Sequence, residues 1–462
     1  MEMKLFNTLG RKQEVFKPIN KNEVGIYSCG PTVYWNQHIG NMYAYVEWDL
    51  LNRTLKYLGY KTNWVMNITD VGHLTSDEDT GEDKLEKGAK SEGLSVWKIA
   101  DKYIAQFKES MKLLNIKEPD ELPRATDHIA EQIKMIEEME ARGFTYKTKT
   151  GIVFDTAKFP DYAKFANLNL EEQKAGSRVE VDEEKKNPWD FLLWITNQPN
   201  HVMQWDSPWG KGFPGWHIEC TAMSTKYLGK KFDIHTGGKE HIPVHHTNEV
   251  AQAYGAFGEQ TANYWLHNEW VTFGGEKISK SAGSAILITD LEEKGFSPLA
   301  YRYLIMTSHY RTGLNFTWES LESAQIALNR LKNSIKKLQE ASSDDIKSNP
   351  KEDINWDEKF KNAIADDLGM PQAIAIFWDM LKGDLSAKDK IELVSKWDKV
   401  FGLDLLEIKK EEIPAEVSEL AKERANARKE KAWQKSDELR DKISELGYEV
   451  LDTENSFEIR PK

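Results

Sequence analysis

Residues 27–41 join an apolar run to an amphipathic helix, and this unit limits the folds open to the chain. The run at 24–27 is rich in β-forming residues, and Gly30-Pro31 ends it. Apolar residues then recur at the spacing of one helix face: Ala44, Trp48, Leu51, Leu55 and Leu58. The pattern predicts a strand–loop–helix unit of an open parallel α/β sheet, whose ligands lie at the carboxyl ends of the strands. His38, near the helix start, is placed to touch a phosphate, although a lone histidine there is more often a turn residue.

The amino-acid composition of the chain limits the kinds of partner that it can bind. Lys plus Arg number 62 and Asp plus Glu 75, so the 462-residue chain carries a formal charge of −13. A chain this acidic has no general affinity for polyanions, and any contact with nucleic acid needs a local basic patch. The N-terminus lacks the apolar core of a secretory signal, and no run is long enough to cross a bilayer. We expect a cytoplasmic monomer with no membrane partner.

The chain has two cysteines, Cys29 and Cys220, and cytosolic proteins rarely join such residues in a disulfide. Buried apolar thiols are their commoner fate. A zinc site is the other interpretation, because His245 and Glu249 stand four residues apart and would project from one helix face. The histidine and glutamate by themselves would favour an ordinary helix start.

Residues 277–281, Lys-Ile-Ser-Lys-Ser, follow paired glycines. Flexible glycines allow such a loop to close on a triphosphate. Its two ammonium groups would then offset charge on a transferred phosphoryl group. A loop of this composition, taken alone, is more often solvated surface.

The rest of the chain is predicted to form several modules. The elements expected between the two motifs are a mobile charged loop, two helices and a strand: 77–93, 96–114, 127–142 and 151–155. Beyond Pro298 helical sequence dominates, with a near-heptad apolar stripe over 321–338. A single charged helix at 415–446 is expected to precede two short strands at 448–451 and 457–460.

These motifs together resemble a known family. His38-Ile39-Gly40-Asn41 resembles the first signature of class I aminoacyl-tRNA synthetases, and residues 277–281 resemble the second. The further likeness is to the cysteinyl-tRNA synthetases, and it spans nearly the whole chain. It rests on four more segments: Asn-Ile-Thr-Asp at 67–70, Pro-Arg-Ala-Thr at 123–126, Pro-Gly-Trp-His-Ile-Glu-Cys at 214–220 and Ser-His-Tyr-Arg at 308–311. Each motif is short, but their joint order and spacing are specific.

The resemblance implies an ATP-dependent ligase. It would activate L-cysteine to cysteinyl-adenylate and transfer it to the 3′ end of cysteine tRNA, with Mg²⁺ accompanying ATP. The resemblance also implies one zinc ion, held by Cys29, Cys220, His245 and Glu249. A pocket wall separates cysteine from serine or alanine by only about 1–3 kcal/mol. A borderline-soft ion separates thiolate from hydroxyl much better, so no editing domain is expected.

The resemblance assigns roles to individual residues as well. The catalytic set is His38, Asn41, Lys277 and Lys280. The residues expected to bind ATP are Gly30, Thr32, His38, Gly40, Asn41 and Lys280. Those expected to bind cysteine are Gly30, Thr69, Trp216 and Glu240. The tRNA anticodon is expected to meet Arg428, Trp433 and Asp437, a local basic and aromatic surface on an acidic chain.

The sequence also departs from the family pattern. Asn41 stands where the first signature commonly has His, and Ile278 where the second has Met. After paired glycines the family usually has Ser-Asp, whereas this chain has Lys239-Glu240, so Glu240 would replace the Asp as partner of the substrate amine. Residues 71–74 replace an acidic run, which leaves the contacts of that loop with tRNA open.

Two other functions remain open from the sequence. A related ligase joins cysteine to an amino-sugar inositol in mycothiol synthesis, and it shares the nucleotide core and the zinc site but lacks an anticodon-binding end. A non-catalytic tRNA-binding relative would need neither the two signatures nor the metal donors. The long helical end argues against the first, and the intact motifs against the second.

The expected fold is α/β: a Rossmann-like parallel-sheet catalytic domain with an insertion domain, followed by a helical bundle and a small C-terminal mixed α/β domain. The expected boundaries are 1–115 and 201–285 for the catalytic domain, 116–200 for the connective insertion, 286–318 for a linker that contacts the tRNA stem, 319–405 for the bundle and 411–462 for the anticodon-binding domain.

Overall fold

A computed structural model describes residues 2–72, 83–168, 184–278, 285–341, 354–407, 414–452 and 457–461. The chain divides into two units, Met1–Leu406 and Glu407–Lys462. Each unit has a hydrophobic core of its own. In the described part of the chain, every helix is too short or too polar to cross a bilayer.

A four-stranded parallel sheet lies at the centre of the larger unit, which confirms the predicted α/β fold. Its strands in spatial order are β10 (Ala262–Asn268), β9 (Phe232–Gly238), β3 (Glu23–Ser28) and β4 (Lys61–Met66). Strand β9 is buried along its whole length, as expected of an interior parallel strand covered on both faces. Because all four strands run the same way, their carboxyl ends meet at one edge of the sheet.

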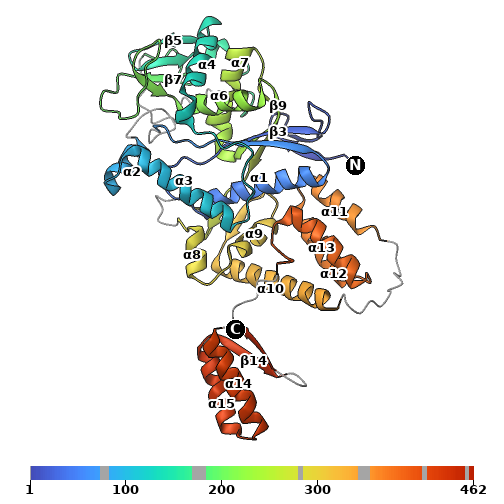
Figure 1. Cartoon of the computed structure of the whole chain (residues 1–462). Helices are drawn as coiled ribbons and strands as arrows, with labels where there is room; N and C mark the ends of the chain where they lie inside the picture. The colour runs from blue at the N-terminus through green and yellow to red at the C-terminus, as the bar shows by residue number, and fades with distance from the viewer. Residues whose placement is uncertain are drawn as a thin grey trace. The chain divides into compact units, whose positions relative to one another are not determined.

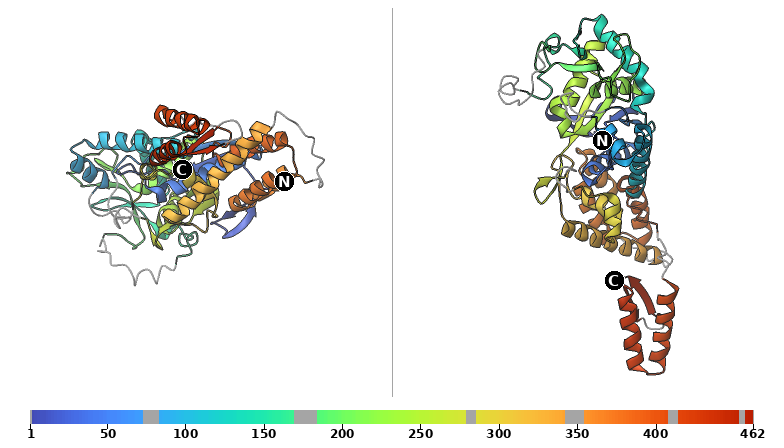
Figure 2. Two further views of the ribbon diagram at one scale, coloured as in Figure 1. Left: turned by 90° about the horizontal axis from the view of Figure 1, so that it is seen from below. Right: turned by 90° about the vertical axis from the view of Figure 1, so that its left-hand side faces the viewer.

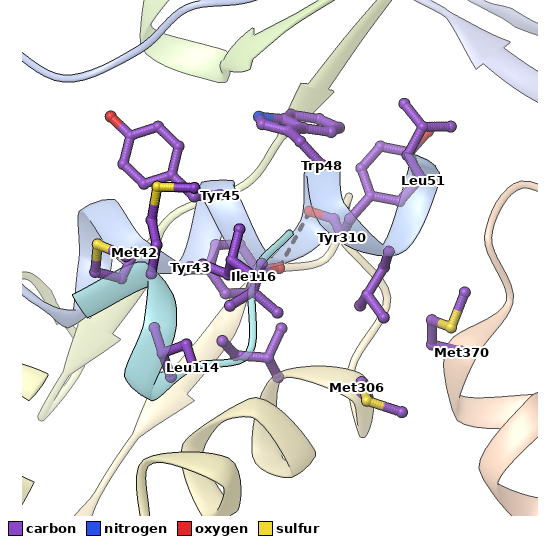
Figure 3. Close-up of a cluster of buried hydrophobic side chains, with 14 of the residues drawn as sticks. Met42, Tyr43, Tyr45, Trp48, Leu51, Leu114, Ile116, Met306, Tyr310 and Met370 are labelled. Carbon is purple, nitrogen blue, oxygen red and sulfur yellow. Dashed lines mark hydrogen bonds between the residues drawn. The ribbon is translucent and has the colours of Figure 1, made fainter. Parts of the chain in front are cut away.

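Helices cover both faces of this sheet (Figure 1). Helix α1 (Ile39–Tyr57) links β3 to β4 across one face, and α6 (Trp216–Leu228) and α7 (Thr247–Phe257) lie on the other. The apolar stripe predicted for α1 is its buried face, since Trp48, Leu51 and Leu55 have no exposed surface. The far side of α1 is apolar as well. There the Tyr43 hydroxyl donates to the carbonyl of Tyr310 at 3.4 Å (Figure 3).

Two buried arginines tie α1 to the end of the helical bundle. The Asp49 carboxylate accepts hydrogen bonds from Arg53 at 2.7 Å and from Arg302 at 2.5 Å. Arg302 also donates to the carbonyl of Phe401, the last residue of α13 (Ala387–Phe401). Cations are favoured at a helix C-terminus, where carbonyls lack intrahelical partners. The arrangement compensates the buried positive charge with one carboxylate and a helix end.

The segment between β4 and β9 carries a second sheet, which is antiparallel. Its strands in spatial order are β5 (Thr145–Lys147), β6 (Gly151–Phe154), β7 (Phe191–Thr196) and β8 (Gly212–Pro214). Helix α4 (Ile129–Ala141), preceded by the 3-10 turn η1 (Ala125–His128), packs on it, and the turn η2 (Thr156–Lys158) follows β6. The sequence analysis missed β7, although all of its residues are buried. Strand β8 extends this sheet beyond residue 200.

Helix α2 (Lys84–Glu92) occupies part of the stretch expected to be a mobile loop, so that prediction is wrong for these residues. The Asp83 carboxylate caps the helix by accepting from the backbone N–H groups of Leu85 and Glu86 at 2.7 and 2.9 Å. Gly93 ends it with φ near 66°. The helix was not predicted from the sequence because its apolar periodicity is weak and its ends are defined mainly by the capping residues. Residues 77–82 of the expected loop lie outside the described residues, and α3 (Val96–Leu113) confirms the helix predicted at 96–114.

Small sheets and helices complete the larger unit. An antiparallel hairpin, β1 (Lys4–Asn7) and β2 (Lys12–Val15), begins the chain. A three-stranded sheet in the order β12 (Glu276–Lys277), β11 (Val271–Phe273), β13 (Leu314–Phe316) leads into the helices. These are α8 (Ile288–Glu293), α9 (Pro298–Met306), α10 (Trp318–Ala341), α11 (Trp356–Ala365), α12 (Met370–Lys382) and α13, and they gather at one end of the unit (Figure 2). The predicted apolar stripe of α10 is buried at Leu321, Leu328 and Ile335.

The smaller unit contains two helices and a hairpin. They are α14 (Ala415–Lys429), α15 (Trp433–Glu445), β14 (Tyr448–Asp452) and β15 (Phe457–Pro461). The two strands confirm the prediction, but the single helix predicted over 415–446 is wrong. Lys431 has φ near 57°, a left-handed conformation that a continuous helix cannot contain. The chain turns there, so α14 and α15 pack against each other over Val417, Ala421 and Ile443.

Candidate active site

A cavity of about 1090 Å³ opens at the carboxyl edge of the parallel sheet. Its lining contains eight of the predicted site residues: Cys29, Gly30, Thr32, His38, Gly40, Asn41, Trp216 and Glu240. They come from the loop after β3, from the first turn of α1, from α6 and from the turn after β9. This is the place in an open α/β sheet where ligands are expected.

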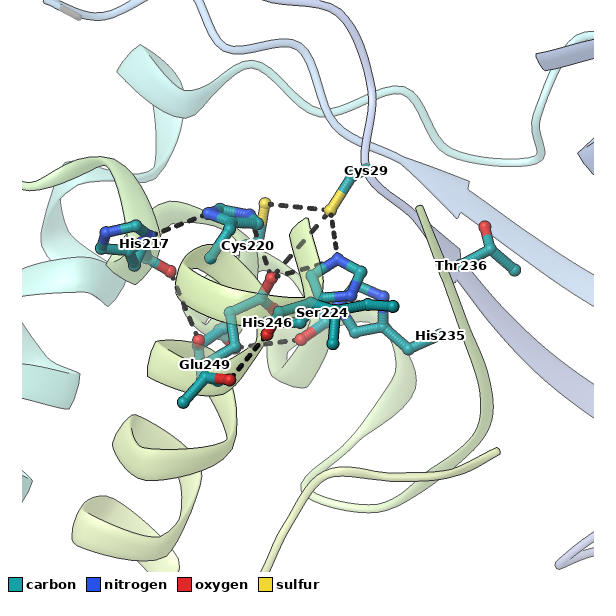
Figure 4. A network of polar contacts seen from close by, with 12 residues as sticks. Cys29, His217, Cys220, Ser224, His235, Thr236, His246 and Glu249 are labelled. Carbon is teal, nitrogen blue, oxygen red and sulfur yellow. Dashed lines mark hydrogen bonds and ion pairs between the residues drawn. The ribbon is translucent and has the colours of Figure 1, made fainter. Parts of the chain in front are cut away.

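Three of the four predicted metal donors, Cys29, His245 and Glu249, gather beside this cavity, and the fourth, Cys220, lies next to Cys29 (Figure 4). The Cys29 Sγ atom lies 4.0 Å from Cys220 Sγ and 4.0 Å from Glu249 Oε1. The His245 Nε2 atom lies 3.0 Å from the same Glu249 oxygen. The four side chains come from three separate stretches of the chain, and Cys29, the most exposed of them, is only 8% exposed. A disulfide is absent, because both cysteines are free.

The donor set fits a zinc ion. Zinc bonds of about 2.0–2.3 Å in tetrahedral geometry hold their donor atoms roughly 3.3–3.8 Å apart, and the three separations given above run from 3.0 to 4.0 Å. Two sulfurs, an imidazole nitrogen and a carboxylate oxygen are ligands that zinc accepts. Burial alone would raise the pKa of Glu249, but His235 and His245 lower it to about 2, so the carboxylate is ionised and ready to bind.

His246 is a further donor that the sequence analysis missed. Its Nε2 atom lies 3.2 Å from Cys29 Sγ and 3.8 Å from Glu249 Oε1. Cys29, His245, His246 and Glu249 therefore form a tight group of donor atoms, all within 4.8 Å of one another. Regular α-helical geometry would direct two adjacent histidines to different sides. The π-helical turn η4 (Ile242–His246) brings both to the cluster.

A second layer of histidines surrounds the donors. The His235 Nε2 atom lies 2.9 Å from Glu249 Oε2, and the His246 Nδ1 atom lies 2.7 Å from His267 Nε2. The ring of Trp216 stacks on His245 at 4.3 Å between centroids. Such outer contacts fix the orientation of metal ligands. No spacing in the sequence pointed to His235 or His267, because each stands alone on a strand.

His38 and Asn41 form a capping box at the start of α1. The His38 Nδ1 atom accepts from the backbone N–H of Asn41, and the Asn41 Oδ1 atom accepts from the N–H of His38, both at 3.3 Å. Because Nδ1 accepts, the proton of the neutral imidazole lies on Nε2. The ring can then donate a hydrogen bond to an anionic ligand in the cavity. Gly40 allows this, since a Cβ atom there would lie 3.0 Å from the His38 ring.

Gly30 is required by a close approach of two strand ends. A Cβ atom at this position would lie 1.7 Å from the carbonyl oxygen of Asn67, and the Gly30 N–H donates to Asn67 Oδ1 at 2.8 Å. Thr69 lies in the same region, but it is only 2% exposed and its Oγ1 accepts from Asn67 Nδ2 at 3.1 Å. Thr69 does not line the cavity in the described part of the chain. It supports the loop rather than forming the cavity wall.

Glu240 lines the cavity and is oriented by a tryptophan. Its Oε2 atom accepts from Trp270 Nε1 at 2.8 Å. The neighbouring Lys239 lies 3.7 Å from the centroid of the Trp270 ring and forms an ion pair with Glu269. Lys239 and Glu240, which stand where the family usually has Ser-Asp, thus both contact Trp270.

The second signature is described only at its start. Lys277 ends β12, and Ile278 is buried at 2% exposure, close to the position of Gly40. The Lys277 side chain and Lys280 lie outside the described residues. The start of this loop therefore lies against the first signature.

Comparison with known proteins agrees with this geometry. The family model described as "tRNA synthetases class I (C) catalytic domain" matches residues 15–326, and the one described as "Cysteinyl-tRNA ligase anticodon binding domain" matches residues 410–460. The chain belongs to the cysteine–tRNA ligase family.

Members of this family are similar over almost the whole chain. The cysteine–tRNA ligase of Treponema denticola is 45% identical, covering 97% of each protein. Cysteine–tRNA ligase 1 of Burkholderia lata is also 45% identical, covering 98% of this chain and 96% of its own. A methionyl-tRNA synthetase structure from Mycobacterium tuberculosis shares the fold, with a TM-score of 0.57 at 14% identity over 82% of this chain and 90% of that one.

The predicted anticodon residues of this family member lie in the smaller unit. Arg428, in the last turn of α14, lies 5.9 Å from the ring of Trp433, which begins α15 and is 57% exposed. Asp437 follows one turn later and is also exposed. Asp452 holds the arginines of α14, contacting Arg428 at 3.3 Å. An exposed aromatic ring beside a cation suits stacking on an unpaired base.

Proposed function

We propose that this chain is a catalytically complete cysteine–tRNA ligase. It activates L-cysteine with ATP and transfers the cysteinyl group to the 3′ end of cysteine tRNA. The observation that carries this proposal is the convergence of Cys29, Cys220, His245 and Glu249 beside the cavity. A zinc ion held by these donors would bind the thiolate of cysteine in preference to the hydroxyl of serine.

In the first step, the cysteine carboxylate attacks the α-phosphate of ATP, forming cysteinyl-adenylate and releasing pyrophosphate. His38 would donate from Nε2 to a phosphate oxygen, and the N-terminus of α1 would favour the negative charge. Lys277 and Lys280 would close over the phosphates, with ATP entering as its Mg²⁺ complex. Positioning and charge stabilisation supply most of the acceleration.

Recognition of cysteine would involve both walls of the cavity. What zinc supplies in such a site is a preference for thiolate sulfur over a hydroxyl or a methyl group. Trp216, stacked on His245, would limit the size of the side chain, and Glu240 would accept from the substrate ammonium. In the second step, a ribose hydroxyl of the terminal adenosine attacks the activated carbonyl, and AMP leaves.

We also propose the functional division of the chain that the family implies. Residues 1–115 and 201–285 would carry the chemistry, with 116–200 inserted between them. Residues 286–318 would contact the tRNA stem, 319–405 would form the bundle, and 411–462 would read the anticodon. The separate core of the smaller unit supports the last boundary.

Two assays test the proposed function. Cysteine-dependent ATP–pyrophosphate exchange reports the first step, and charging of cysteine tRNA reports both steps. We expect both activities. Exchange without charging would favour the ligase of mycothiol synthesis, and neither activity would favour a non-catalytic tRNA-binding protein.

Metal analysis tests the donor set. Protein purified without chelators is expected to hold one zinc ion per chain. Cys220→Ala should lower the zinc content well below one and weaken the discrimination of cysteine from serine by at least tenfold. His246→Ala should retain the metal, because His246 belongs to the surrounding layer in this proposal. Loss of zinc from the His246 variant, but not from the Cys220 variant, would mean that His246 and not Cys220 is the fourth zinc ligand.

A further inference from the structure

Helix α2 forms one wall of the cavity, and neither the two signatures nor the metal donors give it a role. Its residues that line the cavity are Lys87, Gly88, Ser91 and Glu92. These positions follow one stripe of the helix, whereas Leu85 and Ala89 on another side are buried in the core. Lys90 is exposed on the same helix but does not line the cavity in the described part of the chain.

The wall is held rigidly against the insertion. The Asp83 carboxylate that caps α2 also lies 2.9 Å from His201 Nε2, while His201 Nδ1 lies 3.0 Å from the carbonyl oxygen of Met203. The His201 ring therefore bridges the cap of α2 and the backbone of the insertion. The ring stacks on Phe213 of β8, with centroids 3.9 Å apart. Glu86 adds a bond from the Val202 N–H at 2.7 Å.

The chemistry of the wall suits the end of a nucleic acid. Lys87 provides an ammonium group, and Tyr34 and Trp35 provide aromatic rings on the adjoining loop. The nearby Glu92 carboxylate forms an ion pair with Lys102 at 2.5 Å and accepts from the Tyr103 hydroxyl. Single-stranded RNA is bound by stacking on aromatic rings together with cations on its phosphates.

The cavity is slightly larger than the usual pocket for one small ligand. Pockets for a single drug-sized ligand measure about 300–1,000 Å³, and this cavity measures about 1090 Å³. The reaction proposed above brings three reactants together, of which the third is the 3′ end of a tRNA. On a chain with a formal charge of −13, that end needs local positive charge.

We propose that α2 receives the 3′-terminal, single-stranded nucleotides of the tRNA, with the Lys87 ammonium on a phosphate of that end. This inference rests on the proposed function and specifies where its third substrate is held. Lys87 acts in the transfer of the cysteinyl group and not in its activation.

The test uses the full chain with Lys87→Ala, Lys87→Arg and the matched control Lys90→Ala. Single-turnover transfer is measured from preformed cysteinyl-adenylate to cysteine tRNA, and pyrophosphate exchange is measured without tRNA. Lys87→Ala should raise the tRNA concentration for half-maximal transfer about five- to twentyfold and leave exchange within about twofold. Lys87→Arg should recover most of the loss, and Lys90→Ala should resemble the unaltered protein.

Two further readouts separate a phosphate contact from a general change in the fold. The slope of log affinity against log salt should fall by about 0.7 for one lost contact with a single strand. The defect should persist with a short RNA hairpin that ends in the acceptor sequence and lacks the anticodon arm.

Three results would overturn the proposal. Exchange that falls as much as transfer in Lys87→Ala would place Lys87 on ATP. Equal defects in Lys87→Ala and Lys90→Ala would mean that only the overall charge matters. A defect absent with the hairpin would move the contact to another part of the tRNA. Absence of exchange in the unaltered protein would instead overturn the proposed function together with this inference.

Discussion

At the scale of single residues, Asn41 shows how one departure from the family pattern fits its surroundings. The position commonly holds His, yet the Asn41 carboxamide accepts from the N–H of His38 and completes the cap of α1. The same bonds orient the His38 ring, so the residue acts on the fold and on the site together.

Asn41→Ala should therefore lose both effects. Removal of one capping interaction costs about 1 kcal/mol of stability, and a freer His38 ring should lower the exchange rate about tenfold. Asn41→Asp keeps an oxygen acceptor for the His38 N–H and should retain the stability. Urea unfolding and pyrophosphate exchange measure the two effects. Full activity in Asn41→Ala would mean that the cap does not orient His38.

Glu47 is an ionisable residue buried outside the site. It lies on α1 with 2% exposure, and its Oε1 atom has no hydrogen-bond partner in the described part of the protein. Burial raises the pKa of Glu47 to about 8, against smaller opposing effects of Tyr43 and Arg302. Folding thus favours the protonated carboxyl. The associated stability is complete below the ordinary pKa of 4.5 and is lost as the pH rises through about 8.

Glu47→Gln should remove this pH dependence. At pH 5 the variant and the unaltered protein should have similar free energies of unfolding, because Glu47 is then protonated. At pH 8 the variant should be more stable, by up to roughly 3 kcal/mol. Denaturant unfolding at both pH values measures the difference, with Glu293→Gln, an exposed residue of α8, as the control. A variant that is less stable at pH 8 would show that the ionised carboxylate is bound favourably.

At the scale of elements, α2 depends on its cap more than on its sequence pattern. The Asp83 carboxylate accepts from two N–H groups of the helix and also contacts His201 of the insertion. Asp83→Ala should increase amide hydrogen exchange over 84–92 by about tenfold or more, because it removes the cap and the partner of a buried imidazole. Peptides from α3 should be unchanged. Unchanged exchange in α2 would mean that apolar packing alone holds the helix.

The elements that were predicted from the sequence are those with strong apolar periodicity. Helices α3 and α10 and the parallel strands carried clear patterns. Strand β7 was missed because its continuous apolar run follows a polar stretch, and such a run does not show which other strands it pairs with. The break at Lys431 was missed because lysine carries no local signal for a left-handed backbone. The metal donors, which are dispersed along the chain, were predicted from the resemblance to the family. His246 was not predicted, because it reaches the cluster through a π-helical turn that no spacing rule predicts.

At the scale of the whole molecule, the smaller unit carries its own core and its own candidate contacts with RNA. Val417, Ile443 and Val450 hold it together, and Arg428 and Trp433 lie on its surface. In the proposed function, catalysis of the first step uses none of these residues. The two functions should therefore separate when the surface is altered.

Trp433→Ala should weaken charging and spare exchange. Loss of one stacking contact costs about 1–3 kcal/mol, so the KM for tRNA should rise roughly five- to hundredfold while exchange stays unchanged. A tRNA with an altered anticodon should lose less from this substitution than cysteine tRNA does. Equal losses for both RNAs would mean that Trp433 does not read the anticodon.

Because the candidate zinc ligands are dispersed along the chain, they are synthesised at widely separated times. Cys29 leaves the ribosome early, whereas Glu249 follows only after more than half of the chain has been made. The nascent chain therefore contains the Cys29 thiol for a long interval before any of the other candidate ligands has been synthesised. Metal loading must wait for α7 to dock against the completed sheet, so acquisition of the ion would report that the catalytic half has reached its native topology.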